Sequence, residues 1–278
     1  MTLREAFGYG NTYLESRDIR EPGLDAWHLL EYVTGKSRSD YYAHGEERLT
    51  PTQVIFYEKL LEKRGGRIPL QHLTGRQEFM GLSFRVNAEV LIPRQDTETL
   101  VEEALKILRP GMRVLDLCTG SGCILISLLA LCPGMEGLGT DISPGALSVA
   151  RENAAARGVK AEFRKSDMFA RISGEPFDCI VANPPYIASR DIPGLMEEVR
   201  EYEPRQALDG GEDGLRFYRI LAKEAGSHLK SGGQMYLEIG CDQGESVPAL
   251  LRSCGFSEVA VIRDLCGNDR VVKGTWIE

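Results

Sequence analysis

The sequence is poor in the residues that build metal sites and disulfide frameworks. It has only four histidines and seven cysteines among 278 residues, and no two cysteines form a CxxC pair. Without an HExxH motif or clustered Cys/His spacing, we expect no structural or catalytic metal site. The cysteines are odd in number and scattered, several of them in apolar stretches, which argues against a disulfide framework.

Long apolar runs are also missing. The longest, CILISLLALC at residues 123–132, is too short to span a bilayer and predicts a buried helix instead. The first ten residues, MTLREAFGYG, carry charge where a signal peptide needs an apolar core. These absences predict a cytoplasmic protein that does not associate with membranes.

Positive charge is scarce as well. Lys and Arg number 33 against 41 Asp and Glu, which gives a formal net charge of −8. A protein that coats nucleic acid needs a dense face of Lys and Arg. Direct nucleic-acid binding is therefore not expected, although this balance does not exclude a local basic patch.

The first part of the chain has the pattern of helices. Apolar residues recur at helical spacing over residues 3–64 with no strand-like alternation, and Thr50 and Pro51 have the features of an N-cap and a first helical residue for a helix over 51–63. A chain of this length suits one large domain plus a smaller one. We therefore predict a small helical domain over residues 1–68.

The rest of the chain has the pattern of an α/β domain. Residues 69–90 contain glycines and short β-rich pieces around the dipeptide MG, which predicts a hairpin linker. Strand and helix signals then alternate over 91–278, and two strand-like runs joined by LCGN close the sequence as an antiparallel hairpin. The alternation predicts a doubly wound, mostly parallel seven-stranded sheet of the Rossmann-like kind.

Acidic residues stand at the tips of three successive predicted strands. Asp116 precedes the turn CTGSG, Asp141 ends the second strand, and Asp167 and Met168 follow the third. Each acid alone could be a surface residue or a helix N-cap. Together they suit a positive centre, ribose hydroxyls and an adenine amine beside an apolar side chain, which describes S-adenosylmethionine. The predicted cofactor site comprises Asp116, Cys118, Thr119, Gly120, Ser121, Gly122, Asp141, Ile142, Asp167, Met168 and Asn183.

The stretch NPPY follows an apolar run over 177–182 that reads as a buried strand. Proline neither donates to a ladder nor continues into a helix, so the strand stops at Asn183. The stretch could be a simple turn. Alternatively it is a binding site, because ligands of open α/β sheets lie at the carboxyl ends of the strands.

These motifs resemble a known family. VLDLCTGSG, TDIS, SDMF and NPPYI, in that order, are similar to the class I S-adenosylmethionine methyltransferases that carry an NPPY motif. PLQHLTGRQEFMGLSFRV, LIPRQDTE, EPRQALDGGEDGL and EIGCDQGE resemble the peptide-chain release factor glutamine methyltransferases, the HemK/PrmC group. The resemblance runs from about residue 69 to 274, and the helical segment before it suits the small N-terminal substrate-recognition domain of that family.

The resemblance implies the activity. The substrate is then the glutamine of the Gly-Gly-Gln loop of release factors, methylated on its side-chain nitrogen, which tunes translation termination. Asp141 holds the ribose, and Met168 and Asn183 border the cofactor. The catalytic residues are Asn183, Pro184, Pro185 and Tyr186. Cys118 departs from the glycine of many relatives and Met168 from the tryptophan of some.

Other interpretations stay open at this point. A clamp for a planar NH2 group also suits adenine or cytosine in a nucleic acid, or a glutamine of a ribosomal protein. The loop over 187–214 could be a flap over the substrate or a solvated connection. Arg94 could steer an acidic partner or pair with an internal acid.

Overall fold

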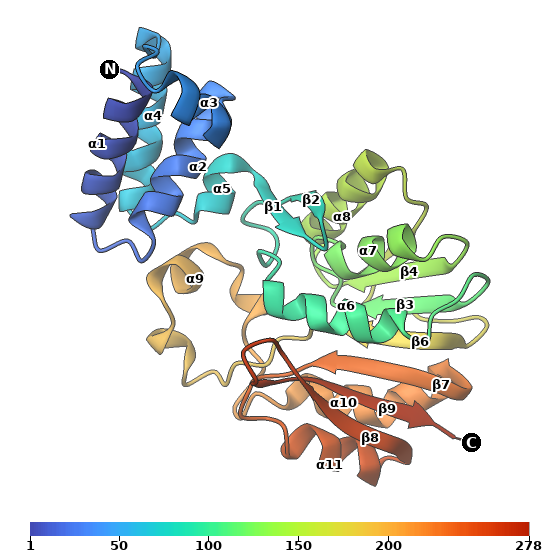
Figure 1. Cartoon of the computed structure of the whole chain (residues 1–278). Helices are drawn as coiled ribbons and strands as arrows, with labels where there is room; N and C mark the ends of the chain where they lie inside the picture. Colours follow the sequence, from blue (N-terminus) through green and yellow to red (C-terminus); the bar gives the residue numbers. More distant parts are fainter. Residues whose placement is uncertain (278) are drawn as a thin grey trace. The chain divides into compact units, whose positions relative to one another are not determined.

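The protein, represented by a computed structural model, divides into two units, and the structure describes residues 1–277. The first unit is Met1–Arg76 together with Met196–Tyr202, and the second is residues 77–195 together with the chain from residue 203 onward. Figure 1 shows the elements of both. No helix within residues 1–277 combines the length and the apolar character needed to cross a membrane.

The first unit is helical, as predicted, but it extends beyond residue 68 and includes a short helix within the segment predicted as the hairpin linker. Its helices are α1 (Leu3–Glu15), α2 (Pro22–Thr34), α3 (Arg38–His44), α4 (Pro51–Gly65), α5 (Leu70–Thr74) and α9 (Glu197–Tyr202). The predicted start of α4 is confirmed. The Thr50 hydroxyl accepts from the Gln53 backbone N–H at 3.3 Å, and the Gln53 side-chain oxygen accepts from the Thr50 backbone N–H at 2.9 Å. Pro51 follows this cap.

The short helix α9 joins this unit from a distant part of the sequence. Glu198 accepts from Arg64 at 3.3 Å and from Arg67 at 3.4 Å, and the Tyr202 hydroxyl donates to the Gly66 carbonyl at 2.8 Å. Arg64 is itself buried and donates to Asp25 at 2.6 Å. The predicted loop over 187–214 is therefore partly structured, and its middle belongs to the helical unit.

The predicted hairpin, β1 (Arg76–Phe79) and β2 (Leu82–Arg85), belongs to the second unit except for its first residue, Arg76. Met80 and Gly81 make its turn with φ of 51° and 70°. Two central residues with positive φ match the natural twist of a hairpin.

A seven-stranded sheet follows, in the order β5-β4-β3-β6-β7-β9-β8. Its strands are β3 (Arg113–Leu117), β4 (Glu136–Asp141), β5 (Glu162–Lys165), β6 (Phe177–Ala182), β7 (Leu229–Glu238), β8 (Phe256–Arg263) and β9 (Asp269–Trp276). Neighbours from β5 to β7 run parallel, and β9 pairs antiparallel with both β7 and β8. The predicted sheet and its closing hairpin are confirmed.

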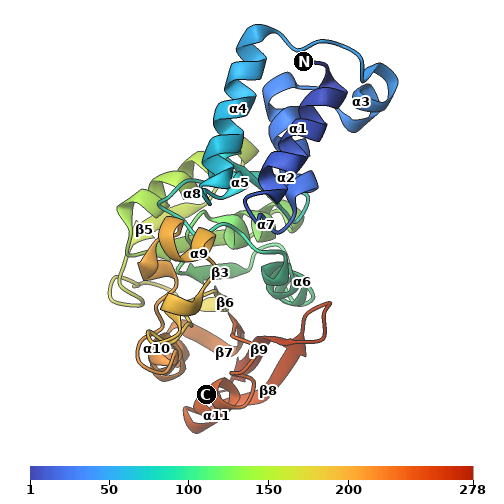
Figure 2. The ribbon, with the colours of Figure 1, turned by 90° about the vertical axis from the view of Figure 1, so that its left-hand side faces the viewer.

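Helices cover both faces of this sheet. They are α6 (Glu98–Leu105), α7 (Cys123–Leu131), α8 (Pro144–Arg157), α10 (Arg216–Glu224) and α11 (Ser246–Ser253), with short 3-10 turns at Gln95–Thr97, Ile192–Gly194, Arg205–Ala207 and Ala225–His228. Alternate residues of β6 enter opposite cores: Cys179 and Val181 face α6, α7 and α8, whereas Ile180 and Ala182 face α10 and α11. Figure 2 shows α6 and α10 on opposite sides of β3 and β6.

Two glycines of α1 offer a matched test of packing in the helical unit. A Cβ at Gly10 would collide with the Tyr57 hydroxyl and lie 3.2 Å from the Ala26 Cβ, whereas a Cβ at Gly8 meets nothing within 4 Å. Gly10→Ala should therefore lower the free energy of unfolding by about 1–3 kcal/mol. Gly8→Ala should raise it by about 0.5–1 kcal/mol, because alanine favours the helix. Urea unfolding of both variants checks this, and equal effects would contradict it.

Candidate active site

The register of the parallel strands brings the predicted site residues to one edge of the sheet. Leu117 at the end of β3 lies opposite Thr140 of β4 and Ala182 of β6. One step further, Asp141 lies opposite Lys165 of β5. The turns that follow these strands therefore leave the sheet side by side.

A cavity of about 460 Å³ lies at this edge, within the size range of small-molecule sites. Ten of the predicted site residues line it: Cys118, Thr119, Gly120, Ser121, Asp141, Ile142, Asp167, Met168, Asn183 and Pro185. The other four, Asp116, Gly122, Pro184 and Tyr186, do not line it. The structure thus brings together residues from four separate strand ends.

Three residues of the turn after β3 have left-handed backbone conformation. Cys118, Gly120 and Gly122 have φ of 59°, 53° and 80°. For Cys118, the position that departs from the family's glycine, this conformation costs about 1–2 kcal/mol. Its Sγ lies 3.9 Å from the Sδ of Met168, which also has positive φ, of 44°. The turn keeps its geometry with a side chain present.

Gly122 has a packing role that the sequence did not reveal. A Cβ there would lie 2.9 Å from Ile126 and 3.1 Å from Ala150. These residues belong to α7 and α8. The glycine thus lets the start of α7 approach α8 closely.

Asp141 ties the tip of β4 to the glycine turn. Its Oδ2 accepts from the Gly120 amide at 3.0 Å and its Oδ1 from the Ser143 amide at 2.9 Å. Burial raises the pKa of the Asp141 carboxyl, and these backbone hydrogen bonds oppose the increase. A carboxylate has lone pairs left after two such contacts, so Asp141 can still accept hydrogen bonds from a group in the cavity.

The Met168 side of the cavity is fixed by its own backbone. The Ser166 hydroxyl donates to the Met168 carbonyl at 2.8 Å, which holds the left-handed turn after β5. Met168 is buried, whereas Ile142 on the β4 side is half exposed. The cavity therefore has apolar surface from two strand ends beside the carboxylates of Asp141 and Asp167.

Asp116 lies behind the cavity rather than in its wall. Its side chain is fully buried, and its Oδ2 accepts from the Thr119 hydroxyl at 2.5 Å. Burial raises the pKa of Asp116 to about 7, although the Thr119 hydrogen bond lowers it. A cationic cofactor thus finds no direct contact with Asp116 in this geometry. The carboxyl instead orients Thr119, which does line the cavity.

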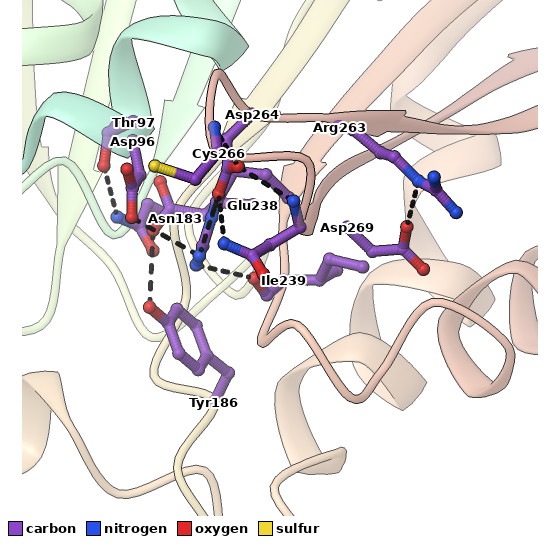
Figure 3. A network of polar contacts seen from close by, with 12 residues as sticks. Asp96, Thr97, Asn183, Tyr186, Glu238, Ile239, Arg263, Asp264, Cys266 and Asp269 are labelled. Atoms are coloured by element: carbon purple, nitrogen blue, oxygen red, sulfur yellow. Dashed lines mark hydrogen bonds and ion pairs between the residues drawn. The ribbon is translucent and has the colours of Figure 1, made fainter.

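The NPPY turn leaves β6 at the same edge. Asn183 and Pro185 line the cavity, and Pro184 is buried between them. The Asn183 Nδ2 donates to the Thr97 hydroxyl at 3.4 Å. Tyr186 points away from the cavity. Its hydroxyl donates to Glu238 at 3.4 Å (Figure 3), and its carbonyl accepts from the side-chain amide of Gln243 at 3.1 Å.

Several polar contacts of the site could not be predicted from the sequence. Arg94 lines the cavity and pairs with Glu203 at 2.5 Å, so it pairs with an internal acid, one of the two alternatives left open. Thr97, Glu238 and Gln243 support the NPPY turn although none was predicted to do so. The only signal for Glu238 was an acid at the end of the apolar run MYLE.

Comparison with known proteins now identifies the family. The PrmC N-terminal domain model matches residues 5–75, and the methyltransferase small domain model matches residues 95–202. A release factor glutamine methyltransferase of Geobacter sulfurreducens is 39% identical over 98% of this chain and 96% of its own length. One of Moorella thermoacetica is 43% identical over 97% of each chain. The chain belongs to the release factor glutamine methyltransferase family.

This membership confirms the predicted family and the predicted enzyme class, an S-adenosylmethionine-dependent methyltransferase. A solved structure, a methyltransferase from Pyrococcus furiosus, aligns with a TM-score of 0.56 at 20% identity, covering 78% of this chain and all of its own. That likeness supports the predicted fold. The cavity also suits the cofactor, because carboxylates, the turn from Cys118 to Ser121 with its central glycine, and apolar surface meet in it.

The buried Asp116 carboxyl generates a prediction on pH dependence. A carboxyl with a raised folded-state pKa holds a proton that the unfolded chain releases, so its contribution to stability is lost as pH rises from about 4 to about 7. Asp116→Asn stays neutral and keeps an acceptor oxygen for Thr119. Between pH 5 and pH 8 the wild-type free energy of unfolding should fall by about 1 kcal/mol or more beyond that of the variant. Urea unfolding at both pH values measures this, and equal falls would contradict it.

Proposed function

We propose that this chain transfers a methyl group from S-adenosylmethionine to the side-chain amide nitrogen of the glutamine in the Gly-Gly-Gln loop of peptide-chain release factors. One observation carries the proposal: Asn183 and Pro185 of the NPPY turn line the same cavity as the Asp141 and Asp167 carboxylates. The names of the relatives support the choice of substrate. When bound, S-adenosylmethionine supplies a methyl group already activated by its sulfonium.

The residues of the chain then have to align a weak nucleophile. The lone pair of a carboxamide nitrogen is delocalised into its carbonyl. The Asn183 side-chain oxygen, in the cavity wall, accepts one N–H of the substrate amide. The carbonyl of Pro184, which is buried between the two lining residues, accepts the other, and together they orient the nitrogen. Both acceptors also stabilise the positive charge that develops on that nitrogen. No general base is needed, because the nitrogen becomes strongly acidic once methylated.

The same turn explains the residue types. Pro184 restrains Asn183 to extended backbone, and Pro185 restrains Pro184 in the same way. The Asn183 side-chain oxygen and the Pro184 carbonyl therefore point in the same direction. Tyr186 is held by Glu238 and Gln243, and this contact anchors the end of the turn.

The cofactor residues have complementary roles in this proposal. Asp141 accepts from the ribose hydroxyls, and Asp167 accepts from the adenine amine. Met168 and Ile142 provide apolar contact for the adenine ring. The turn from Cys118 to Gly122 lets the backbone approach the methionine end of the cofactor.

The remaining predictions belong to the same proposal. Residues 1–68 form the substrate-recognition domain, 69–90 the hairpin linker and 91–278 the methyltransferase domain. The protein works in the cytoplasm on a protein substrate, without direct contact to nucleic acid. Methylation of a ribosomal protein or of a nucleic-acid base is not favoured, because the relatives carry the release-factor name over nearly their whole length.

The proposal is tested by methyl transfer from labelled S-adenosylmethionine. Purified release factor is offered in its wild-type form and with the glutamine of the Gly-Gly-Gln loop changed to alanine, with ribosomal protein and DNA in parallel. Label should appear on the wild-type release factor alone. Label on ribosomal protein or DNA would overturn the substrate, and label on the alanine form would overturn the acceptor atom.

Removing one acceptor should impair turnover rather than cofactor binding. Asn183→Ala should lower kcat by about 100-fold or more, the scale of losing one preorganised polar contact. The affinity for S-adenosylmethionine, measured by calorimetry, should change little. Steady-state methylation of release factor gives kcat, and a variant as active as wild type would contradict the two-acceptor arrangement.

A further inference from the structure

Gln243 is a buried side-chain amide that joins three loops at the end of the NPPY turn. It lies between β7 and α11 and is 7% exposed. Its side-chain oxygen accepts from the Gly240 backbone N–H at 2.9 Å. Its NH2 group donates to the Tyr186 carbonyl at 3.1 Å and to the Gly214 carbonyl at 3.3 Å. A backbone N–H only donates and a carbonyl only accepts, so these partners fix the direction of the amide.

The loop that carries this glutamine is itself held on both sides. The Gln243 backbone N–H donates to the Gly240 carbonyl at 2.9 Å, and the Gln243 carbonyl accepts from the Val247 backbone N–H at 3.1 Å. The Ser246 hydroxyl donates to the same carbonyl at 3.2 Å. The side chain therefore extends from a fixed backbone, which sets the place where its NH2 group meets Tyr186.

The turn over residues 210–214, which we call the second glycine turn, lies directly against the Tyr186 backbone. A Cβ at Gly214 would lie 2.3 Å from the Tyr186 carbonyl oxygen, and a Cβ at Gly210 would lie 2.8 Å from the Tyr186 Cα. Gly214 also has a φ of 75°, which favours glycine. A larger residue at either position would displace Tyr186.

The second glycine turn is also hydrogen-bonded to the chain that follows Tyr186. The Gly210 backbone N–H donates to the Ile187 carbonyl at 2.8 Å, and the Ser189 backbone N–H donates to the Gly211 carbonyl at 2.8 Å. Ser189 and Gly211 both line the cavity. The chain after the NPPY turn and the second glycine turn thus form one wall of the cavity.

The prolines of the NPPY turn make support from outside necessary. They have no N–H, so neither can be held by a hydrogen bond that its own backbone donates. The Tyr186 hydroxyl contact with Glu238 is long, at 3.4 Å, whereas the Gln243 contact with the Tyr186 carbonyl is 3.1 Å. Because the proline rings restrict φ, the position of the Tyr186 carbonyl limits where the Pro184 carbonyl can point.

We propose that Gln243 is a positioning residue: by holding the Tyr186 carbonyl against the second glycine turn, it sets the direction of the Pro184 carbonyl that accepts from the substrate amide. This inference rests on the proposed function. Gln243 acts through Tyr186, because it does not itself line the cavity. Its primary amide is suited to the role, since it supplies two donors and an acceptor without burying a charge.

Gln243→Met and Gly210→Ala test the inference from two sides of Tyr186. Methionine keeps the length of the side chain but has no N–H donor, and alanine places a Cβ against the Tyr186 Cα. Each variant should lower kcat for release factor by about tenfold or more, because a small misplacement of an aligning group slows the reaction strongly. KM for release factor and the affinity for S-adenosylmethionine, measured by calorimetry, should stay within about twofold, since the lost alignment acts in the transition state.

Hydrogen exchange tests the positioning without measuring activity. In the Gln243→Met variant, the backbone amides of Ser189 and Gly210 should exchange about tenfold faster or more, because the wall to which they belong loses its support. The amides of Val114 and Leu115 in β3 should exchange as in the wild type. Equal exchange of Ser189 and Gly210 in variant and wild type would contradict the inference.

Two matched variants serve as controls. Gln234→Met makes the same substitution in β7, where the glutamine oxygen accepts from the Tyr236 hydroxyl at 2.6 Å, and should leave kcat unchanged. Gly194→Ala adds a methyl group in the same 187–214 segment, where a Cβ meets nothing within 4 Å, and should also leave kcat unchanged.

A double variant shows whether the two changes act on one residue. Gln243→Met combined with Gly210→Ala should be no more than about twofold slower than the worse single variant, because both changes displace Tyr186. Losses that multiply would indicate two independent effects and would refute the shared positioning role.

The outcomes distinguish the two levels of the proposal. Wild-type protein that does not methylate release factor refutes the proposed function, and hydrogen exchange then still decides whether Gln243 holds the wall. Active wild type with a Gln243→Met variant of equal kcat refutes the positioning role alone. So does a loss of kcat that comes with an equal loss of cofactor affinity and faster exchange in β3, since that pattern indicates a general loss of folding.

Discussion

The parallel register of β3, β4 and β6 is the constraint on which the site depends. Because Leu117, Thr140 and Ala182 lie level with one another, the chain leaves three strands at the same height. The glycine turn, the Asp141 carboxylate and the NPPY turn can then line one cavity without long loops. A slip of one residue in β6 would turn Asn183 to the other face of the sheet. The strand register that buries the apolar residues of the sheet therefore also sets the positions of the site residues.

Two buried carboxyls at the edge of the sheet lower folding stability but orient neighbouring hydroxyl groups. Asp116 and Glu238 each have one oxygen without a partner within residues 1–277, and burial raises the pKa of both to about 7. Each accepts from a hydroxyl that belongs to the site or its support, Thr119 or Tyr186. An apolar side chain of similar size would cost less to bury, but it would give these hydroxyls no acceptor. The arrangement thus exchanges folding stability for a defined hydrogen-bond direction.

Much of the fold followed from local signals. The cap at Thr50, the MG hairpin and the alternation of strands and helices are short-range patterns, and the structure reproduces them. Contacts between distant residues were not predictable in this way: the attachment of Glu198 to Arg64 and the pairing of Arg94 with Glu203 join segments more than 100 residues apart. The direction in which a side chain points could not be predicted from the sequence either. The sequence placed Asp116 at a strand end, but only the packed sheet shows that it faces away from the cavity.

The two prolines that follow Asn183 have a common physical explanation. A primary amide that is to be methylated offers two N–H donors, so any donor directed at it competes with the acceptors that align it. Prolines have no N–H, and Pro184 and Pro185 therefore leave the turn with carbonyls alone. Of the two turn residues that line the cavity, Asn183 and Pro185, only Asn183 has a side chain with both donors and an acceptor. Its NH2 group donates to the Thr97 hydroxyl at 3.4 Å, and this contact leaves the side-chain oxygen to accept from the substrate amide.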